Sequence, residues 1–174
     1  MSGPDSPAPS PSTRPAARGV VLFADDEEAI RWLGRRYLQA DGWIVLEACD
    51  GDEALEIVEH SAGELSLVVT DLNMPKVSGR ELAEVLSVFR PGLPVLGITG
   101  FLSAVNRDRR LPVLMKPFTA GSLLQSVRMA CGLAERLRPP AVENRRRALQ
   151  LRELTPAPGS LRAAVRTLRT LERR

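Results

Sequence analysis

Residues 65–75 read LSLVVTDLNMP, an uncharged and mostly apolar run that leads into an aspartate, Asp71. An apolar run without alternation is typical of a strand with both faces buried. Ser78 follows, and Glu81 three residues later completes a capping box, which is the pattern of a helix start. The segment therefore predicts a buried strand at 65–70, a short loop and a helix.

The same alternation of strand and helix extends in both directions along the chain. Apolar residues at helical spacing predict helices after the first, second, third and fifth strands, with Asp50, Ser78 and Thr119 as caps. This alternation predicts an α/β fold with a doubly wound, five-stranded parallel sheet covered on both faces. Five strand–helix units are too few for an eight-stranded barrel. The strands are expected at 20–24, 43–46, 65–70, 95–99 and 113–115.

Composition divides the 174 residues into three parts. Residues 1–18 are rich in proline and serine and are expected to be a disordered lead, because they bury too little surface to offset the entropy of ordering. Residues 19–137 are expected to form the domain, and residues 138–174 an arginine-rich tail. Residues 1–134 carry a net charge of −4 and residues 135–174 carry +7, which sum to the +3 of the chain. The acidic domain is therefore not expected to bind nucleic acid by itself.

Polar side chains lie where the expected strands end, and these five are the candidate site residues: Asp25, Asp26, Asp71, Thr99 and Lys116. Ligands of such sheets bind beyond the carboxyl ends of the strands. Two carboxylates ~4 Å apart repel by roughly 4 kcal/mol at an effective dielectric near 20, so three of them need more than one lysine as counter-charge. Oxygen ligands suit Mg²⁺. No glycine-rich loop follows the first strand, which argues against dinucleotide binding.

Together these residues and their neighbours resemble the receiver domain of bacterial two-component response regulators. Their order, spacing and strand positions match over about residues 18–136. The resemblance implies a flavodoxin-like receiver fold with strand order 2-1-3-4-5, and a role in phosphorelay signalling rather than as an enzyme. The matching motifs are Asp25-Asp26, Asp71-Leu72-Asn73-Met74-Pro75, Thr99 and Lys116-Pro117-Phe118.

The resemblance implies a phosphoacceptor and a metal site. Asp71 is expected to take a phosphoryl group from a sensor histidine kinase or a histidine phosphotransfer protein, since a carboxylate is a competent nucleophile. Asp26 and Asp71 would ligate Mg²⁺ directly, and Asp25 mostly through water. The backbone carbonyl of Asn73 would be a further ligand.

Two more roles follow from the same resemblance. Lys116 would pair with a phosphoryl oxygen and offset the charge of the transferring group. The Thr99 hydroxyl would move to hydrogen-bond the phosphoryl group, and this movement would switch contacts with a downstream protein that the sequence does not identify. The peptide bond between Lys116 and Pro117 is expected to be cis.

Two features depart from the receiver pattern. Val113 stands where many receivers carry an aromatic residue on the fifth strand, so the usual aromatic rotamer switch is absent. Phe101 is a candidate to replace that packing. Only 16 residues separate Thr99 from Lys116, which predicts a shortened fourth helix.

The basic tail allows three interpretations. It is a disordered extension, a helix that docks on a partner or on the receiver itself, or a segment that binds nucleic acid or anionic lipid. Leucine, alanine and valine at helical spacing after Ser160 predict a short amphipathic helix, which is marginal in water without a docking surface. No aromatic residue follows Phe118 to stack on bases, so nucleic acid is the less favoured partner.

Two rival functions remain open. One is a nucleic-acid regulator in which the basic tail is the output under receiver control. The other is a Mg²⁺-dependent phosphohydrolase on a similar sheet. Its nucleophile would follow the first strand with a second acid two residues later, and Glu28 meets that spacing from Asp26.

The two cysteines and the apolar runs indicate the compartment. Cys49 and Cys131 lie far apart without a partner histidine, which is the pattern of neither a zinc site nor a disulfide framework. We expect both to be small core residues in a reducing cytoplasm. Apolar runs such as residues 20–24 are too short for a membrane span.

Overall fold

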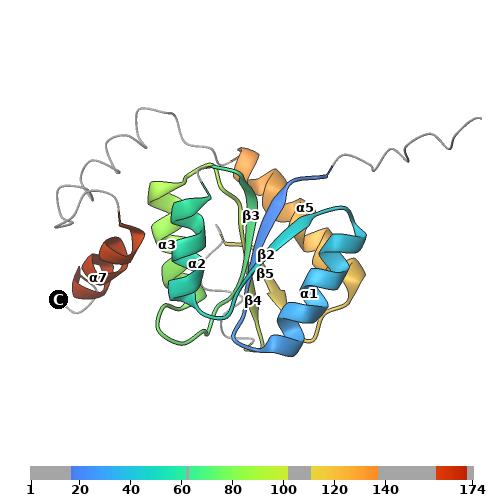
Figure 1. Cartoon of the computed structure of the whole chain (residues 1–174), viewed down its shortest axis with the longest axis horizontal. Helices are drawn as coiled ribbons and strands as arrows, with labels where there is room; N and C mark the ends of the chain where they lie inside the picture. The colour runs from blue at the N-terminus through green and yellow to red at the C-terminus, as the bar shows by residue number, and fades with distance from the viewer. Residues whose placement is uncertain (1–16, 62, 102–110, 137–159, 172–174) are drawn as a thin grey trace, which may run out of the picture.

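The five expected strands form one parallel sheet. In the computed structural model, which describes residues 17–61, 63–101, 111–136 and 160–171, the strands are ordered β2-β1-β3-β4-β5 (Figure 1). The predicted α/β class, parallel sheet and strand order are confirmed. The strands are β1 (Val20–Ala24), β2 (Ile44–Ala48), β3 (Leu65–Asp71), β4 (Val95–Thr99) and β5 (Val113–Met115).

Helices cover both faces of the sheet. α2 and α3 lie on one face and α1 and α5 on the other (Figure 1). Each face encloses its own apolar cluster: Leu22 and Val68 pack on the α2–α3 side, and Phe23 and Val69 pack on the α1–α5 side. The helices are α1 (Glu28–Ala40), α2 (Gly51–His60), α3 (Gly79–Phe89), α5 (Ala120–Arg136) and α7 (Leu161–Leu171).

The edge strand β2 lies further along the chain than expected. The sequence predicted it at 43–46, whereas it runs from Ile44 to Ala48 and pairs with β1 over its whole length. The charge of Glu47 breaks the apolar run in the sequence. An edge strand tolerates such a charge, and Glu47 Oε2 lies 2.5 Å from Arg35 Nη1 of α1.

The expected caps fasten three helix starts. Asp50 Oδ1 accepts a hydrogen bond from a backbone N–H of the first turn of α2 at 2.9 Å. Ser78 and Glu81 form the expected capping box of α3, in which Glu81 N donates to Ser78 Oγ and Ser78 N donates to Glu81 Oε2. Thr119 Oγ1 accepts from the N–H three residues later at 3.2 Å. These caps hold the helix starts in register with the strand ends.

The tail helix α7 docks on the chain's own α2 and α3. Its apolar side is buried in the cluster of that face, and two of its arginines pair with acidic side chains of α2 and α3. Of the three interpretations of the tail, residues 160–171 therefore follow the one in which a helix docks on the receiver itself. Residues 137–159 lie outside the described residues. The buried side chains of α7 are Leu161, Ala164 and Val165.

Other expectations have mixed outcomes. Of the lead, only residues 17 and 18 are described, and the expected shortened fourth helix falls on 102–110, outside the described residues. Cys49 is exposed after β2, so its assignment to the core is wrong, whereas Cys131 is half-buried against the α1–α5 cluster. Within the described ranges, no helix combines the length and apolarity that crossing a membrane requires.

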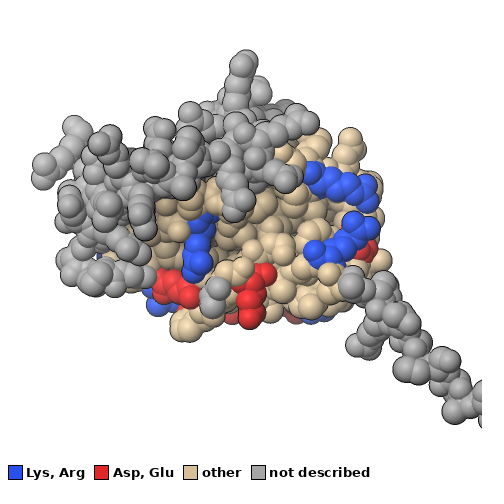
Figure 2. Space-filling view, turned by 90° about the horizontal axis from the view of Figure 1, so that it is seen from above, with Lys and Arg blue, Asp and Glu red and all other residues tan. Residues whose placement is uncertain are grey.

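Charged side chains are interspersed on the face seen in Figure 2. Basic and acidic residues lie there among uncharged ones. Several charges are locally paired: Asp41, after α1, lies 3.4 Å from Arg18 Nε and 3.8 Å from Arg128 Nη2. Exposed pairs of this kind contribute little to stability, on the order of 0–1 kcal/mol each. The core clusters therefore carry most of the stability of the fold.

The start of α3 packs directly on the end of β3. A Cβ on Gly79 would lie 2.0 Å from the Asp71 carbonyl oxygen, which is backbone and cannot rotate away. We expect Gly79→Ala to lower the free energy of unfolding by about 1–3 kcal/mol, measured by urea denaturation.

Gly132→Ala is the matched control for this substitution. Gly132 lies in α5, and a Cβ added there would have no described atom of another part of the chain within 4 Å. The substitution is expected to stabilise the protein by about 0.5–1 kcal/mol through helix propensity. Equal effects of the two substitutions would contradict the close contact at Gly79.

Candidate functional site

The carboxyl edge of the sheet brings the candidate residues together. Asp25 and Asp26 follow β1, Asp71 ends β3, Thr99 ends β4 and Lys116 follows β5. Because all strands are parallel, these ends lie at the same edge. The site therefore takes its residues from four neighbouring strands and is fixed by the topology of the sheet.

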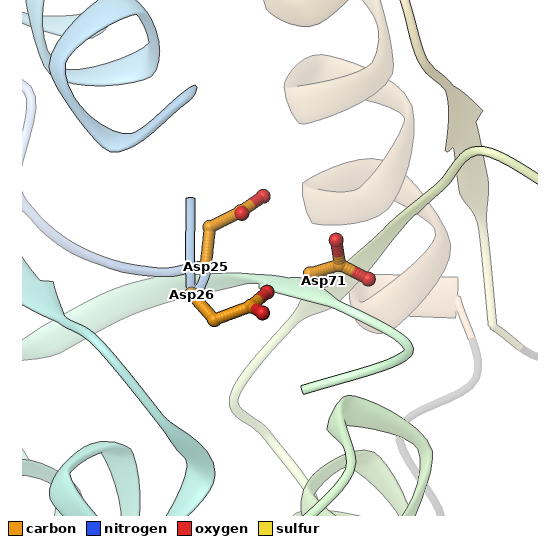
Figure 3. A group of neighbouring side chains, drawn as sticks. All are labelled: Asp25, Asp26 and Asp71. Atoms are coloured by element: carbon orange, nitrogen blue, oxygen red, sulfur yellow. The ribbon is translucent and has the colours of Figure 1, made fainter. Parts of the chain in front are cut away.

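Three carboxylates converge at this edge. Oxygen atoms of Asp25, Asp26 and Asp71 all lie within 4.8 Å of one another (Figure 3). Asp25 is fully buried, Asp71 is buried and Asp26 is exposed. The cluster is thus covered by protein on one side and open to solvent at Asp26.

Lys116 supplies the counter-charge. Its Nζ lies 2.5 Å from Asp71 Oδ2, 2.8 Å from Asp25 Oδ2 and 3.0 Å from Glu27 Oε1. Burial disfavours the charged form, but the three carboxylates outweigh it and hold the pKa of Lys116 above its ordinary value. Lys116 therefore stays positively charged throughout the neutral pH range.

Asp25 is the carboxylate of the cluster whose ionised form is disfavoured by burial. Burial raises its pKa above the ordinary value, against the opposing effects of Lys116 and of the Glu27 N–H. Its Oδ1 accepts a hydrogen bond from Glu27 N at 3.0 Å. Its Oδ2 is buried and, among the described residues, has only the charge contact with Lys116 and no well-directed hydrogen-bond donor. One lysine does not fully compensate this carboxylate.

The donor set fits a hard divalent cation. Three of the four ligand candidates are carboxylates and the fourth is a backbone carbonyl, that of Asn73, so all are oxygen donors. One buried oxygen, Asp25 Oδ2, lacks a hydrogen bond from the described residues. Mg²⁺ takes oxygen ligands and keeps several waters, which the open side at Asp26 can accommodate. The residues present therefore fit Mg²⁺, and its charge would relieve the repulsion that Lys116 leaves.

Thr99 connects the site to the loop after β4. Its buried hydroxyl accepts hydrogen bonds from Phe101 N at 3.1 Å and from Asn73 Nδ2 at 3.4 Å. Its carbonyl accepts from Lys116 N at 2.8 Å. The peptide bond from Lys116 to Pro117 is cis, as the sequence motif led us to expect. Thr99 thus contacts both neighbouring loops of the site.

Asn73 lies on the loop that leaves β3. Its backbone N–H donates to Asp71 Oδ1 at 2.8 Å, while its side chain is exposed and reaches Thr99. With Lys116 on Oδ2, both oxygens of Asp71 are therefore engaged. These contacts fix the orientation of the Asp71 carboxylate.

Two contributors were not predicted from the sequence. Glu27 pairs with Lys116, and Arg31 Nη1 donates to the carbonyl oxygens of Asp25 at 2.7 Å and Asp26 at 3.1 Å. A signal for Arg31 exists in the spacing, because it falls in the first turn of α1 and can reach back to the two residues before the helix. Arg31 holds the backbone that carries the two acids.

The expected aromatic replacement is wrong. Val113 is half-buried on β5, and Phe101 is 64% exposed, so Phe101 does not fill the packing role considered for it. Its contribution to the site is a backbone N–H, which donates to Thr99.

Comparison with known proteins shows which family and which proteins the chain is similar to. A family model described as the response regulator receiver domain matches residues 21–128. The chain is 36% identical over 114 residues to the sensor kinase CckA of Brucella abortus, covering 63% of this chain and 12% of that protein. It is 32% identical over 112 residues to the response regulator receiver protein CpdR of the same organism, covering 62% of this chain and 92% of that protein. The chain thus spans a small part of the kinase and most of the receiver protein.

Solved structures agree with the fold. The receiver domain of the hybrid histidine kinase CckA superimposes with a TM-score of 0.56 at 34% identity, over 65% of this chain and 99% of that one. The response regulator TrrA of Thermotoga maritima, in complex with Mg²⁺ and BeF, gives a TM-score of 0.58 at 28% identity, over 64% and 98% of the two chains.

The buried charge of Asp25 makes stability depend on pH. Since its pKa is raised on folding, Asp25 favours the fold below its unfolded pKa, and this contribution is lost as pH rises through the folded pKa. We expect Asp25→Asn to raise the melting temperature of the Mg²⁺-free protein at pH 7. The gain should shrink as pH falls toward 4.

Asp26→Asn is the control, because it removes another carboxylate of the same cluster but an exposed one, so that it relieves like-charge repulsion without relieving the burial of a charge. Thermal unfolding monitored by circular dichroism from pH 4 to pH 8 measures both variants. A melting temperature of Asp25→Asn below that of wild type at pH 7 would show that the ion pair with Lys116 outweighs the cost of burial.

Proposed function

Because the chain belongs to the response regulator receiver domain family, we propose that it accepts a phosphoryl group on Asp71 and uses this modification to switch contacts with another protein. The observation that carries the proposal is the position of the Asp71 carboxylate. It lies within reach of the Lys116 ammonium and beside two further carboxylates at the edge of the sheet. The partner that supplies the phosphoryl group would be a sensor histidine kinase or a histidine phosphotransfer protein.

The transfer uses Asp71 as the nucleophile. A carboxylate oxygen of Asp71 attacks phosphorus, the phosphorus–nitrogen bond of the donor's phosphohistidine breaks, and the imidazole leaves with the electron pair. Lys116 lies at 2.5 Å from this carboxylate and offsets the negative charge of the phosphoryl oxygens. The Thr99 hydroxyl, buried next to Asn73, is the group that would turn toward the new phosphoryl oxygen.

Mg²⁺ is part of the proposal. Asp26, Asp71 and the Asn73 carbonyl would hold it, with Asp25 mostly through water. When bound, it supplies a positive charge that polarises the phosphoryl group. The buried Asp25 Oδ2, without a well-directed donor among the described residues, supports a need for further positive charge.

The phosphohydrolase alternative is less well supported. It requires a nucleophile directly after β1, and the spacing to Glu28 makes that nucleophile Asp26. Lys116, whose charge would offset a transferring phosphoryl group, pairs with Asp71 and Asp25 and, among the described residues, forms no ion pair with Asp26. Glu28, the second acid of that pattern, begins α1 and is exposed. We therefore propose a signalling role and not turnover of a free phosphate ester.

The nucleic-acid alternative is also less well supported. Two arginines of α7 already pair with acidic side chains of the domain: Arg162 with Glu56 and Arg169 with Glu81. An arginine held in this way is less available for a phosphate backbone. We propose a protein target, and a reducing cytoplasm as the compartment, consistent with the free thiols of the chain.

Labelling by acetyl phosphate tests the phosphoacceptor. We expect intact-mass measurement of the full chain to show one added phosphoryl group that requires Mg²⁺ and disappears in Asp71→Asn. Asp41→Asn is the matched control, because Asp41 follows the end of α1 and pairs with Arg18 and Arg128, which do not belong to the cluster. Labelling that persists in Asp71→Asn, or steady hydrolysis of a phosphate ester by wild type, would contradict the proposal.

A further inference from the structure

The tail helix reaches the loop that follows the phosphoacceptor strand. Arg169 Nε lies 2.5 Å from Glu81 Oε1, and its Nη2 lies 3.1 Å from Glu81 Oε2. The same Nη2 donates to the carbonyl oxygen of Lys76. One guanidinium of α7 therefore holds both the start of α3 and the loop 72–78.

The loop 72–78 contains one strained backbone position and a residue that contacts the candidate site. Lys76 has a φ of 64°, a left-handed conformation that costs a residue other than glycine on the order of 1 kcal/mol. The loop also contains Asn73, which orients Asp71 and contacts Thr99. A change in the conformation of this loop would therefore reach the acidic cluster.

Two clamps hold Lys76 in place. On the α2 side, its Nζ lies 2.5 Å from Asp50 Oδ2, the cap of α2. On the α7 side, Arg169 binds its carbonyl oxygen. The clamp from α2 belongs to the domain itself, whereas the clamp from α7 exists only while the tail helix is docked.

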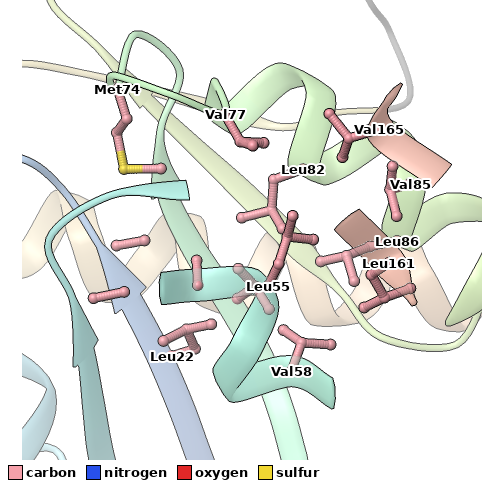
Figure 4. Close-up of a cluster of buried hydrophobic side chains, with 14 of the residues drawn as sticks. Leu22, Leu55, Val58, Met74, Val77, Leu82, Val85, Leu86, Leu161 and Val165 are labelled. Atoms are coloured by element: carbon pink, nitrogen blue, oxygen red, sulfur yellow. The ribbon is translucent and has the colours of Figure 1, made fainter. Parts of the chain in front are cut away.

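The docking of α7 is well anchored. Figure 4 shows Leu161 and Val165 packed among side chains of α2 and α3, next to Val85 and Leu86. At its start, Leu161 N donates to a carboxylate oxygen of Glu59. Hydrogen bonding from Arg169 holds the pKa of Glu81 down at about 2, so this carboxylate stays ionised and paired near neutral pH.

We propose that Arg169 is a positioning residue for the phosphorylation site, and that docking of α7 and binding of Mg²⁺ at Asp25, Asp26 and Asp71 favour each other. With α7 docked, the loop holds the Asp71 carboxylate through the Asn73 N–H, in the arrangement in which the three carboxylates fit the cation. The inference rests on the proposed function, because it concerns the same site. It adds that the tail acts on the site from the α2–α3 face.

The coupling is reciprocal. If docked α7 raises the affinity for Mg²⁺ by some factor, Mg²⁺ strengthens the docking by the same factor. A partner that removed α7 from the receiver would therefore weaken Mg²⁺ binding at Asp71 without touching it.

The test compares two arginine variants of the full chain. Arg169→Met removes the guanidinium but keeps an unbranched apolar side chain. Arg162→Met makes the same chemical change in the same helix. The guanidinium of Arg162, however, binds Glu56 and the Asp52 carbonyl on α2 and not the loop 72–78. We expect Arg169→Met to weaken Mg²⁺ binding about fivefold by isothermal titration calorimetry, and Arg162→Met to change it by less than about twofold.

Two further measurements separate positioning from general damage. The labelling rate with acetyl phosphate, measured against Mg²⁺ concentration, should show a higher half-saturating concentration in Arg169→Met with an unchanged plateau. Hydrogen exchange of the Mg²⁺-free protein should be faster at residues 72–78 in Arg169→Met than in Arg162→Met. In wild type, saturating Mg²⁺ should slow exchange in α7.

The outcomes are distinct. Equal Mg²⁺ affinities and equal exchange at 72–78 in the two variants would overturn the coupling, even if Asp71 is labelled normally. A lower plateau with unchanged half-saturation would also overturn it, because a loss of folded protein lowers the amplitude and not the affinity. If wild type binds no Mg²⁺ and takes no label, the proposed function fails. The positive coupling to Mg²⁺ fails with it, whatever the exchange at 72–78 shows about the clamp.

Discussion

Like charge held at one edge of the sheet is the constraint around which this molecule is arranged. A parallel sheet places Asp25, Asp26 and Asp71 together, and the burial of Asp25 and Asp71 prevents water from screening these two fully. Lys116 partly compensates this repulsion with its positive charge. Arg31 holds the backbone carbonyl of Asp25, and the Glu27 N–H holds the Asp25 carboxylate. The remaining shortage of positive charge is what makes the site suited to a cation and to a phosphoryl group that arrives with one.

The loop after β3 connects that edge to the helices of the α2–α3 face. It is held between Asp50 on one side and Arg169 on the other, and Gly79 lets α3 start directly against the Asp71 carbonyl. Because these contacts are backbone contacts or short ion pairs, the loop has little freedom to move without breaking one of them. The acidic cluster, the capping box of α3 and α7 therefore form one connected set of contacts.

The sequence predicted the sheet and its edge well, because strand ends and caps depend on local patterns. The apolar runs identified all five strands, and the polar residues after them identified the residues that meet at the edge. The position of β2 was wrong because Glu47 is compensated by Arg35, a contact between residues 12 positions apart. Cys49 and Phe101 were misplaced because exposure at a strand end depends on which loops cover it. The hydrogen bond from Arg169 to the Lys76 carbonyl joins residues that are 93 positions apart in the sequence. No local pattern could have predicted it.

The apolar cluster between α2 and α3 has a consequence for how the chain is made. Residues 161–171 complete that cluster although they follow the rest of the domain by a long connection. The folding unit is therefore discontinuous: strands and helices that emerge first from the ribosome leave part of the α2–α3 face bare until α7 has been synthesised. At roughly 5–20 residues per second, this delay lasts a few seconds, during which the exposed apolar face is open to chaperones or to a neighbouring chain.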